Sequence, residues 1–228
     1  MQAIAEAWAM AGASGIVITG RKADVLESVA TSLKSPDVKV LAQAADITDE
    51  ASVARLFAAA KRGIGKIDVL INSAGSLEGG LVGTTDPKTF FNDFQVNVLG
   101  TYIVLYHFLA QADGTGTIVS FTTGAIANVF PGMGGYTASK TALTRIMENL
   151  HAEQPNIRVF ILIPGIVLTG MTVDELKPHA KDSPELSASW TLFLSTPRAE
   201  WMRGGIVSVN CESLPSPYIL KNYQTFLT

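Results

Sequence analysis

Short apolar runs separate longer stretches with helical spacing along most of the chain. The runs are nearly continuous instead of alternating with polar residues, as expected of strands that are buried on both faces of a parallel sheet. They predict strands at 16–19, 38–42, 69–71, 117–121, 159–163 and 206–210. Helical spacing predicts helices at 3–11, 23–33, 50–61, 87–111 and 136–151.

This order of elements predicts a single α/β domain over residues 1–228, because alternating strands and helices build βαβ units. We expect three layers, with a Rossmann-like parallel sheet between two layers of helices. Ligands of such sheets bind outside the carboxyl ends of the strands. The glycine-rich runs Gly79-Gly80 and Gly132-Met133-Gly134-Gly135 are expected in loops.

Composition narrows the function classes. The chain of 228 residues is 47% hydrophobic and 16% charged. Its net charge of −3 does not indicate the basic surface that a nucleic-acid-binding protein needs. Its apolar runs are too short to cross a bilayer, and Glu6 interrupts an N-terminus that has no basic start. We therefore expect a cytoplasmic protein that binds neither membranes nor nucleic acid.

Cysteine and histidine give no sign of a metal site. Cys211 is the only cysteine, so it cannot form a disulfide framework within the chain, and we expect it to be buried. The three histidines have no spacing that suggests metal binding or a catalytic triad. Asp68 and Asp93 stand alone in the sequence and are expected to face solvent.

The strongest chemical signal is Tyr136 and Lys140, four residues apart on one face of a predicted helix. A lysine ammonium one turn from a phenol stabilises the phenolate. Tyr136 is therefore a candidate acid or base near neutral pH. A Tyr-x-x-x-Lys pair alone is weak evidence, and its context makes it specific.

That context resembles the short-chain dehydrogenase/reductase family, of the classical, fungal type, over nearly the whole chain. The run Gly135-Tyr136-Thr137-Ala138-Ser139-Lys140 is similar to the family's active-site motif. Asn97 matches its helix asparagine, and Thr123 stands where the family usually has a substrate-orienting serine. The resemblance implies that Tyr136, Lys140, Thr123 and Asn97 are catalytic.

The resemblance also implies a set of cofactor-binding residues. Arg21 follows the 16–19 strand, where a basic residue favours NADP over NAD in this family. Asp46 corresponds to an acidic turn at the adenine ring. The segments Asn72-Ser73-Ala74-Gly75 and Pro164-Gly165-Ile166-Val167-Leu168-Thr169 match the family's Asn-Asn-Ala-Gly and Pro-Gly-x-Val-x-Thr motifs. The implied binding residues are Arg21, Asp46, Asn72, Ala74, Gly75, Pro164, Gly165 and Thr169.

One family feature has no counterpart in the sequence. The family opens with a strand and a glycine-rich phosphate loop, whereas residues 1–9 already read as the helix that follows them. An N-terminally truncated sheet is expected, in which the 16–19 strand pairs directly with the strand at Ile67 or another chain closes the gap. Loss of about three charge-assisted hydrogen bonds would weaken cofactor binding roughly 10³- to 10⁶-fold.

Three functions follow from these observations. The favoured one is a repurposed enzyme in which Tyr136 and Lys140 do acid–base chemistry on a small carbonyl or phenolic secondary metabolite, without hydride transfer. Isomerisation, cyclisation, elimination or retro-aldol cleavage would fit, and no cofactor would be needed. The alternatives are an NADP(H)-dependent ketoreductase or alcohol dehydrogenase, and a non-catalytic partner of a full-length relative.

Two further expectations come from the resemblance. Residues 170–195 would form a substrate lid, whose apolar residues suit an apolar or aromatic substrate or else pack on the core. The helices at 87–111 and 136–151 would join copies of the chain in a homo-oligomer.

Overall fold

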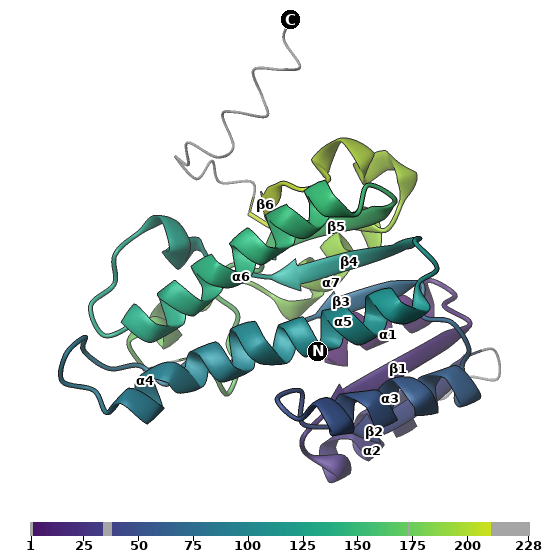
Figure 1. Ribbon diagram of the computed structural model, residues 1–228, viewed down its shortest axis with the longest axis horizontal. Coiled ribbons are helices and arrows are strands. Elements are labelled where there is room, and N and C mark those ends of the chain that lie inside the picture. Colours follow the sequence, from purple (N-terminus) through teal and green to yellow (C-terminus); the bar gives the residue numbers. More distant parts are fainter. Residues whose placement is uncertain (1, 34–37, 173, 211–228) are drawn as a thin grey trace, which may run out of the picture.

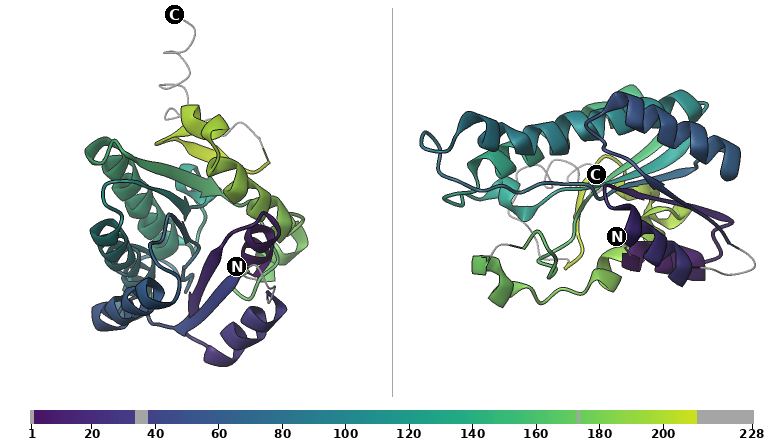
Figure 2. Two further views of the ribbon diagram at one scale, coloured as in Figure 1. Left: turned by 90° about the vertical axis from the view of Figure 1, so that its right-hand side faces the viewer. Right: turned by 90° about the horizontal axis from the view of Figure 1, so that it is seen from below.

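The computed structural model describes residues 2–33, 38–172 and 174–210, and Cys211 lies outside them. Strands β1 (Gly15–Gly20), β2 (Lys39–Ala44), β3 (Val69–Asn72), β4 (Gly116–Phe121), β5 (Ile157–Ile163) and β6 (Ile206–Ser208) all pair in parallel. Helices cover both faces of these strands (Figures 1 and 2). The predicted three-layer, Rossmann-like α/β architecture is confirmed.

The helices follow the predicted order. They are α1 (Gln2–Met10), α2 (Ala23–Ser32), α3 (Glu50–Gly63), α4 (Pro87–Phe94), α5 (Thr101–Gln111), α6 (Gly134–Glu153) and α7 (Pro184–Leu194). Side-chain caps fix several helix starts: the Asp49 carboxylate accepts the Ala51 N–H of α3, and the Ser183 hydroxyl accepts the Leu186 N–H of α7. Short helical turns lie at η2 (Gly124–Ala127), η3 (Asp174–His179) and η4 (Pro197–Met202).

Two predictions about helices were wrong in detail. The predicted helix at 87–111 is interrupted by a π-helical segment, η1 (Gln95–Gly100), between α4 and α5. Helix α6 begins at Gly134, so Gly134 and Gly135 belong to the helix and not to a loop. A Cβ on Gly135 would lie 2.7 Å from the Phe90 carbonyl oxygen, so glycine is required where α6 approaches α4.

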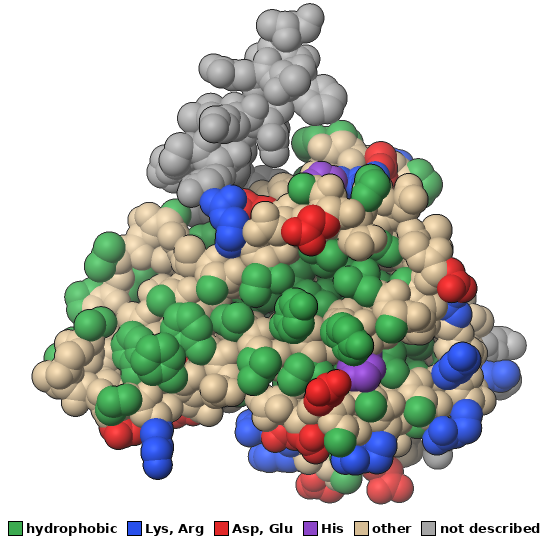
Figure 3. Space-filling model, in the orientation of Figure 1, with side chains coloured by type: hydrophobic (Ala, Val, Ile, Leu, Met, Phe, Trp, Pro, Cys, Tyr) green, Lys and Arg blue, Asp and Glu red, His purple; other side chains and the backbone are tan. Residues whose placement is uncertain are grey.

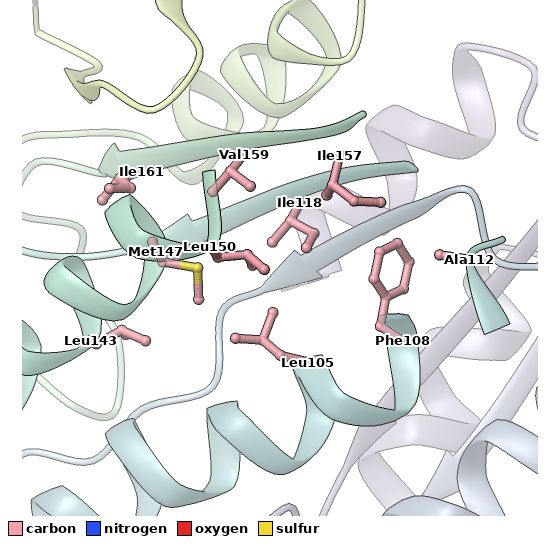
Figure 4. Packing of buried hydrophobic residues seen from close by; sticks show 10 residues of the cluster. All are labelled: Leu105, Phe108, Ala112, Ile118, Leu143, Met147, Leu150, Ile157, Val159 and Ile161. Carbon is pink, nitrogen blue, oxygen red and sulfur yellow. The ribbon is translucent and has the colours of Figure 1, made fainter. Parts of the chain in front are cut away.

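The main core lies between β4 and β5 on one side and α5 and α6 on the other (Figure 4). Phe108 and Met147 from the two helices are fully buried against Ile118 and Val159 from the two strands. Burial of one such side chain stabilises the fold by about 1.5–3 kcal/mol. This core fixes α6 against the sheet and thereby positions the residues on its first turns.

The sheet is divided into two parts, β1-β2 and β3-β4-β5-β6. Figure 1 shows the purple strands β1 and β2 set apart from the other four. Among the described residues β1 and β3 do not pair, so the predicted direct pairing across the gap is wrong. The interruption expected in the sheet is nevertheless present at that position.

Candidate active site

The candidate catalytic residues meet at the carboxyl edge of the sheet. Thr123 follows β4, the helix α6 that carries Tyr136 and Lys140 packs on β5, and Asn97 comes from η1. Lys140 and Asn97 are 4% and 0% exposed. The four residues predicted to be catalytic are therefore brought to one place by η1, the start of η2 and α6.

Tyr136 is half-buried at the start of α6, and its phenol hydrogen-bonds to the Thr123 hydroxyl. The Thr123 hydroxyl also accepts the Ala125 N–H at 3.2 Å, which fixes its position at the start of η2. Burial raises the pKa of Tyr136 above its usual value, the Thr123 hydrogen bond opposes that rise, and the charge of Asp93 adds to it. Tyr136 is therefore a neutral phenol at neutral pH, ready to donate a proton.

Lys140 is a buried cation with few partners. Its Nζ donates to the Phe121 carbonyl oxygen at 3.0 Å, and burial lowers its pKa to about 8, against the opposing effect of Asp93. The expectation that Lys140 would lower the pKa of Tyr136 is not met in this structure. The reason is that burial disfavours the phenolate and the Lys140 ammonium is directed to the Phe121 carbonyl.

Asn97 holds the loop after β3 against α6. Its Oδ1 accepts the Ser76 N–H at 2.8 Å, and its Nδ2 donates to the Ser76 carbonyl and the Ser139 hydroxyl, each at 2.9 Å. The π-helical turn around Asn97 widens the helix at this point, and such segments are frequent at functional sites. These three hydrogen bonds fix the orientation of the Asn97 side-chain amide.

Asp93 is an additional charged residue of this region, and the expectation that it faces solvent was wrong. It is 1% exposed, and its carboxylate oxygens accept the Glu78 N–H at 3.2 and 3.4 Å. Burial raises the pKa of Asp93, and the Lys140 charge lowers it. A signal was present in the sequence, because Asp93 precedes Asn97 by one turn and shares its helix face.

At the outer end of the edge, the two residues predicted to bind the adenine half of a cofactor lie near each other. Arg21 follows β1 and Asp46 follows β2. Hydrogen bonds from Thr48 lower the pKa of Asp46, and the charge of Arg21 lowers it further by a smaller amount. The Asp46 carboxylate accepts the Thr48 N–H and hydroxyl at 2.9 and 2.7 Å. Arg21 is exposed and free to reach an anionic ligand.

The segment after β3 combines a structural residue with two that border the site. Asn72 is 4% exposed, and its Nδ2 donates to the hydroxyls of Thr101 and Ser120 at 3.1 and 3.2 Å. Its amide is therefore engaged inside the protein. Ala74 and Gly75 are half-buried, and a Cβ on Gly75 would lie 3.6 Å from Lys140 Nζ.

The segment after β5 is shaped by a single carboxylate. Gly165 has φ +74°, and a Cβ there would collide with Asp182, whose Oδ2 accepts the Ile166 N–H at 2.6 Å. Pro164 is half-buried and Thr169 is exposed, with its hydroxyl 3.2 Å from that of Thr172. Glycine is thus required by the turn itself, and the cofactor roles of these residues stay predictions.

The apolar residues of the predicted lid divide into two groups. Met171 is 40% exposed, and its Cε would be 3.5 Å from a Cβ on Gly75, which places it beside the site. Trp190 instead packs on the core, and its Nε1 donates to the Val209 carbonyl at 3.2 Å. Met171 therefore borders the catalytic residues whereas Trp190 packs on the core, and Val173 lies outside the described residues.

The described part of the chain contains no group of three or more His, Cys, Asp or Glu side chains able to hold a metal ion. None of its helices is both long and apolar enough to cross a bilayer.

Several known proteins are similar to this chain in sequence and fold. The short chain dehydrogenase mpl6 of Monascus purpureus is 31% identical, over 90% of this chain and 75% of its own length. The 7alpha-hydroxysteroid dehydrogenase of Escherichia coli (strain K12) is 29% identical, over 91% and 87%. A solved structure of 7 alpha-hydroxysteroid dehydrogenase complexed with NADH and 7-oxo glycochenodeoxycholic acid has a TM-score of 0.84 at 26% identity, covering 94% of this chain and 90% of that one.

The motif matches, the fold and these relatives agree with one another. The sequence pattern of the family described as short chain dehydrogenase matches residues 2–179, which include all four candidate catalytic residues. This chain therefore belongs to the short-chain dehydrogenase family.

Proposed function

We propose that the protein is a nicotinamide-dependent oxidoreductase that interconverts a carbonyl and an alcohol on a small metabolite. The observation that carries this proposal is the convergence of Tyr136, Thr123, Lys140 and Asn97 at the carboxyl edge of the sheet. NADP(H) is the proposed cofactor, because exposed Arg21 follows β1 and can pair with a 2′-phosphate.

The protein's own residues supply the proton chemistry. In the reducing direction, the Tyr136 hydroxyl donates its proton to the substrate carbonyl oxygen, while the Thr123 hydroxyl hydrogen-bonds to the same oxygen. The Lys140 ammonium, one turn away on α6, donates to the Phe121 carbonyl oxygen in this structure and would stabilise the resulting phenolate once it turned toward it. A bound nicotinamide supplies the hydride to the carbonyl carbon, and in the reverse direction it accepts one.

The described residues fit the two ends of such a cofactor. Arg21 and Asp46 lie together at the adenine end, and the Pro164-Gly165 turn lies at the nicotinamide end. Between these ends, the described residues contain no strand, glycine-rich turn and helix in succession that could cradle a pyrophosphate.

The substrate is proposed to be a small apolar or aromatic secondary metabolite. Leu168 and Met171 are 64% and 40% exposed just after β5, on the segment that borders the site. Apolar side chains of this kind can cover an apolar substrate and exclude water from the reacting oxygen. The similarity to dehydrogenases of Monascus species supports a role in fungal metabolism.

A second candidate function is acid–base chemistry without hydride transfer. It is favoured by a specific observation, namely an assembled proton-transfer set around Tyr136 that can exchange a proton without a cofactor. Tyr136 would then exchange a proton with an enol or phenol oxygen in an isomerisation, elimination or retro-aldol reaction. This use of the site stays a prediction.

Titration with NADPH and NADH distinguishes the two candidates. We expect NADPH to quench the fluorescence of the three tryptophans in a saturable manner and to support reduction of small aryl ketones. Arg21→Ala should weaken NADPH binding about tenfold to hundredfold, since a charge-assisted hydrogen bond contributes about 1.5–3 kcal/mol. Calorimetry on both proteins measures the two affinities.

NADH serves as the internal control, because it lacks the 2′-phosphate and its affinity should not respond to Arg21→Ala. Lys22→Ala, at the adjacent exposed residue, is the matched variant. Absence of NADPH binding up to millimolar concentration would refute the redox proposal and leave the cofactor-free one. Equal losses for NADH and NADPH would refute the role of Arg21.

A homo-oligomer is also proposed, on the basis of an exposed apolar stripe along α4, η1 and α5. Figure 3 shows a broad hydrophobic area on this face. Its exposed members are Phe91, Leu99, Tyr102 and Tyr106, at 54%, 44%, 57% and 58%. Large apolar patches of this kind mark interaction sites.

We expect the double variant Tyr102→Glu with Tyr106→Glu to dissociate the oligomer to monomers, because two carboxylates would be buried unpaired at the contact. Analytical ultracentrifugation measures the mass. Met10→Glu, at an 89% exposed position on α1, is the control and should leave the mass unchanged. A wild-type protein that is monomeric at micromolar concentration would contradict the proposal.

A further inference from the structure

Two buried charges of opposite sign lie in the region of the candidate active site. Asp93 and Lys140 are 1% and 4% exposed, and no other charged side chain of the described residues is buried. They come from α4 and α6, which pack against each other, and a Cβ on Gly135 would lie 3.6 Å from Asp93 Oδ2. Because a buried charge is costly unless it has a partner, this pair calls for a common explanation.

The Asp93 carboxylate holds the turn that follows β3. It accepts the Glu78 N–H at 3.2 and 3.4 Å, and it also accepts the Ser76 hydroxyl. Asn97, about one turn further along, accepts the Ser76 N–H at 2.8 Å and donates to the Ser76 carbonyl at 2.9 Å. Asp93 and Asn97 together therefore hold all three polar groups of Ser76.

This turn borders the ammonium of Lys140. A Cβ on Gly75 would lie 3.4 Å from Asn97 Oδ1 and 3.6 Å from Lys140 Nζ. Asn97 also donates to the Ser139 hydroxyl, next to Lys140 on α6, at 2.9 Å. The space around the ammonium thus depends on the side chains that hold Ser76 in place.

The charges around Lys140 single out Asp93 as its partner. The Lys140 ammonium donates to the Phe121 carbonyl oxygen, which has no net charge. The Asp93 charge raises the pKa of Lys140 against the larger effect of burial, and the Lys140 charge lowers that of Asp93. The other titratable groups that interact with Asp93 are exposed Glu78 and the Tyr136 phenol, and neither is a cation.

We propose that Asp93 is a positioning residue of the active site, whose carboxylate is the counter-charge of the Lys140 ammonium and fixes the turn that borders it. Asp93 thereby keeps a cation available to stabilise the Tyr136 phenolate. This inference rests on the proton-transfer roles proposed for Tyr136 and Lys140, which both candidate functions share. It does not depend on whether a hydride is transferred.

A double-mutant cycle tests the counter-charge without measuring activity. Asp93→Asn keeps a side-chain oxygen for the Glu78 N–H and removes the charge, and it is made in the wild type and in Lys140→Met. At pH 7 it should destabilise the wild type more, by about 5- to 100-fold in the equilibrium constant of unfolding, because only there does it leave an ammonium unpaired. Urea unfolding measures all four proteins.

Rescue replaces the cycle if Asp93→Asn alone does not fold at pH 7. The double variant should then fold at pH 7, since neither charge remains. The single variant should fold at pH 9.5, because the pKa of Lys140 is already about 8 in the wild type and the ammonium is then neutral. A single and a double variant that are equally unstable would overturn the proposal.

The pH profile of kcat in the reducing direction tests the role in the reaction. Loss of the Asp93 charge lowers the pKa of Lys140 and that of Tyr136, so the alkaline decline of kcat should move to lower pH in Asp93→Asn. Asp68→Asn, at an exposed position just before β3, is the matched control and should change neither the profile nor the cycle.

Two results would each overturn the proposal. One is an equal effect of Asp93→Asn on unfolding in both backgrounds, which would mean that its charge does not act on Lys140. The other is a lower kcat with an unmoved alkaline decline, as expected of a residue that is only structural. Absence of turnover in the wild type would refute the proposed function instead, and the unfolding cycle would still decide whether Asp93 is the counter-charge.

Discussion

Tyr136→Phe is expected to lower kcat by about 10²- to 10⁴-fold, because it removes the group that exchanges a proton with the substrate oxygen. The phenol hydroxyl is the only atom lost, and its partner in the protein is the Thr123 hydroxyl. Loss of one neutral hydrogen bond changes the free energy of unfolding by only about 0.5–1.5 kcal/mol. The measurement is turnover of small ketones with NADPH, and of enolisable ketones without cofactor.

Tyr106→Phe is the matched control, since Tyr106 is 58% exposed on α5 and away from the site. It should leave kcat unchanged. Both candidate functions require Tyr136, so the variant tests the site independently of the hydride question. Undiminished turnover in Tyr136→Phe, with unfolding curves like those of the wild type, would show that Tyr136 is not the acid.

Local patterns were sufficient for the fully buried strands and for the order of the elements. β5 carries a continuous apolar run from 159 to 163 and β4 a run interrupted by Ser120, and their predicted positions agree with the structure to within two residues. β6 ends at Ser208, two residues earlier than predicted. Its end depends on where pairing with β5 stops, which the apolar pattern does not specify.

The π-helical turn at Gln95–Gly100 could not be predicted from periodicity. Apolar spacing is compatible with an uninterrupted α-helix from 87 to 111, and the widening coincides with tertiary hydrogen bonds of Asn97 to Ser76 and Ser139. The motif identified Asn97 itself, because its chemistry is local to the sequence. Its geometry depends on a loop about 20 residues away.

The burial of Asp93 was missed for a related reason. An isolated carboxylate is most often solvated, and its environment depends on packing between elements. Here α4 packs against α6, with Gly135 close to the Phe90 carbonyl, and Asp93 is enclosed between that contact and the Glu78 N–H. The four-residue spacing from Asn97 indicates the helix face of Asp93, but no local pattern indicates the neighbour that covers it.

Lys140→Met is expected to change how stability depends on pH, by an amount large for a single residue. Folding lowers the pKa of Lys140 from 10.5 to about 8, so the unfolded chain binds the proton more tightly. In the wild type, the buried Lys140 ammonium therefore lowers the free energy of unfolding below pH 8, and this loss is recovered as the pH rises toward 10.5. The stability of the variant minus that of the wild type should fall by about 2 kcal/mol from pH 7 to 9.5.

The two titratable neighbours of Lys140 do not reverse this sign. Burial raises the pKa of Tyr136, so this phenol ionises at a higher pH than an ordinary tyrosine, and the substitution removes the attraction between Lys140 and the Asp93 carboxylate at both pH values. Urea unfolding at pH 7 and 9.5 gives the four free energies, with Lys88→Met on the exposed face of α4 as the control. A difference that stays constant between the two pH values would mean that Lys140 is not destabilised by burial. A falling difference together with lost turnover would show that the buried Lys140 ammonium lowers the stability of the fold and is required for turnover.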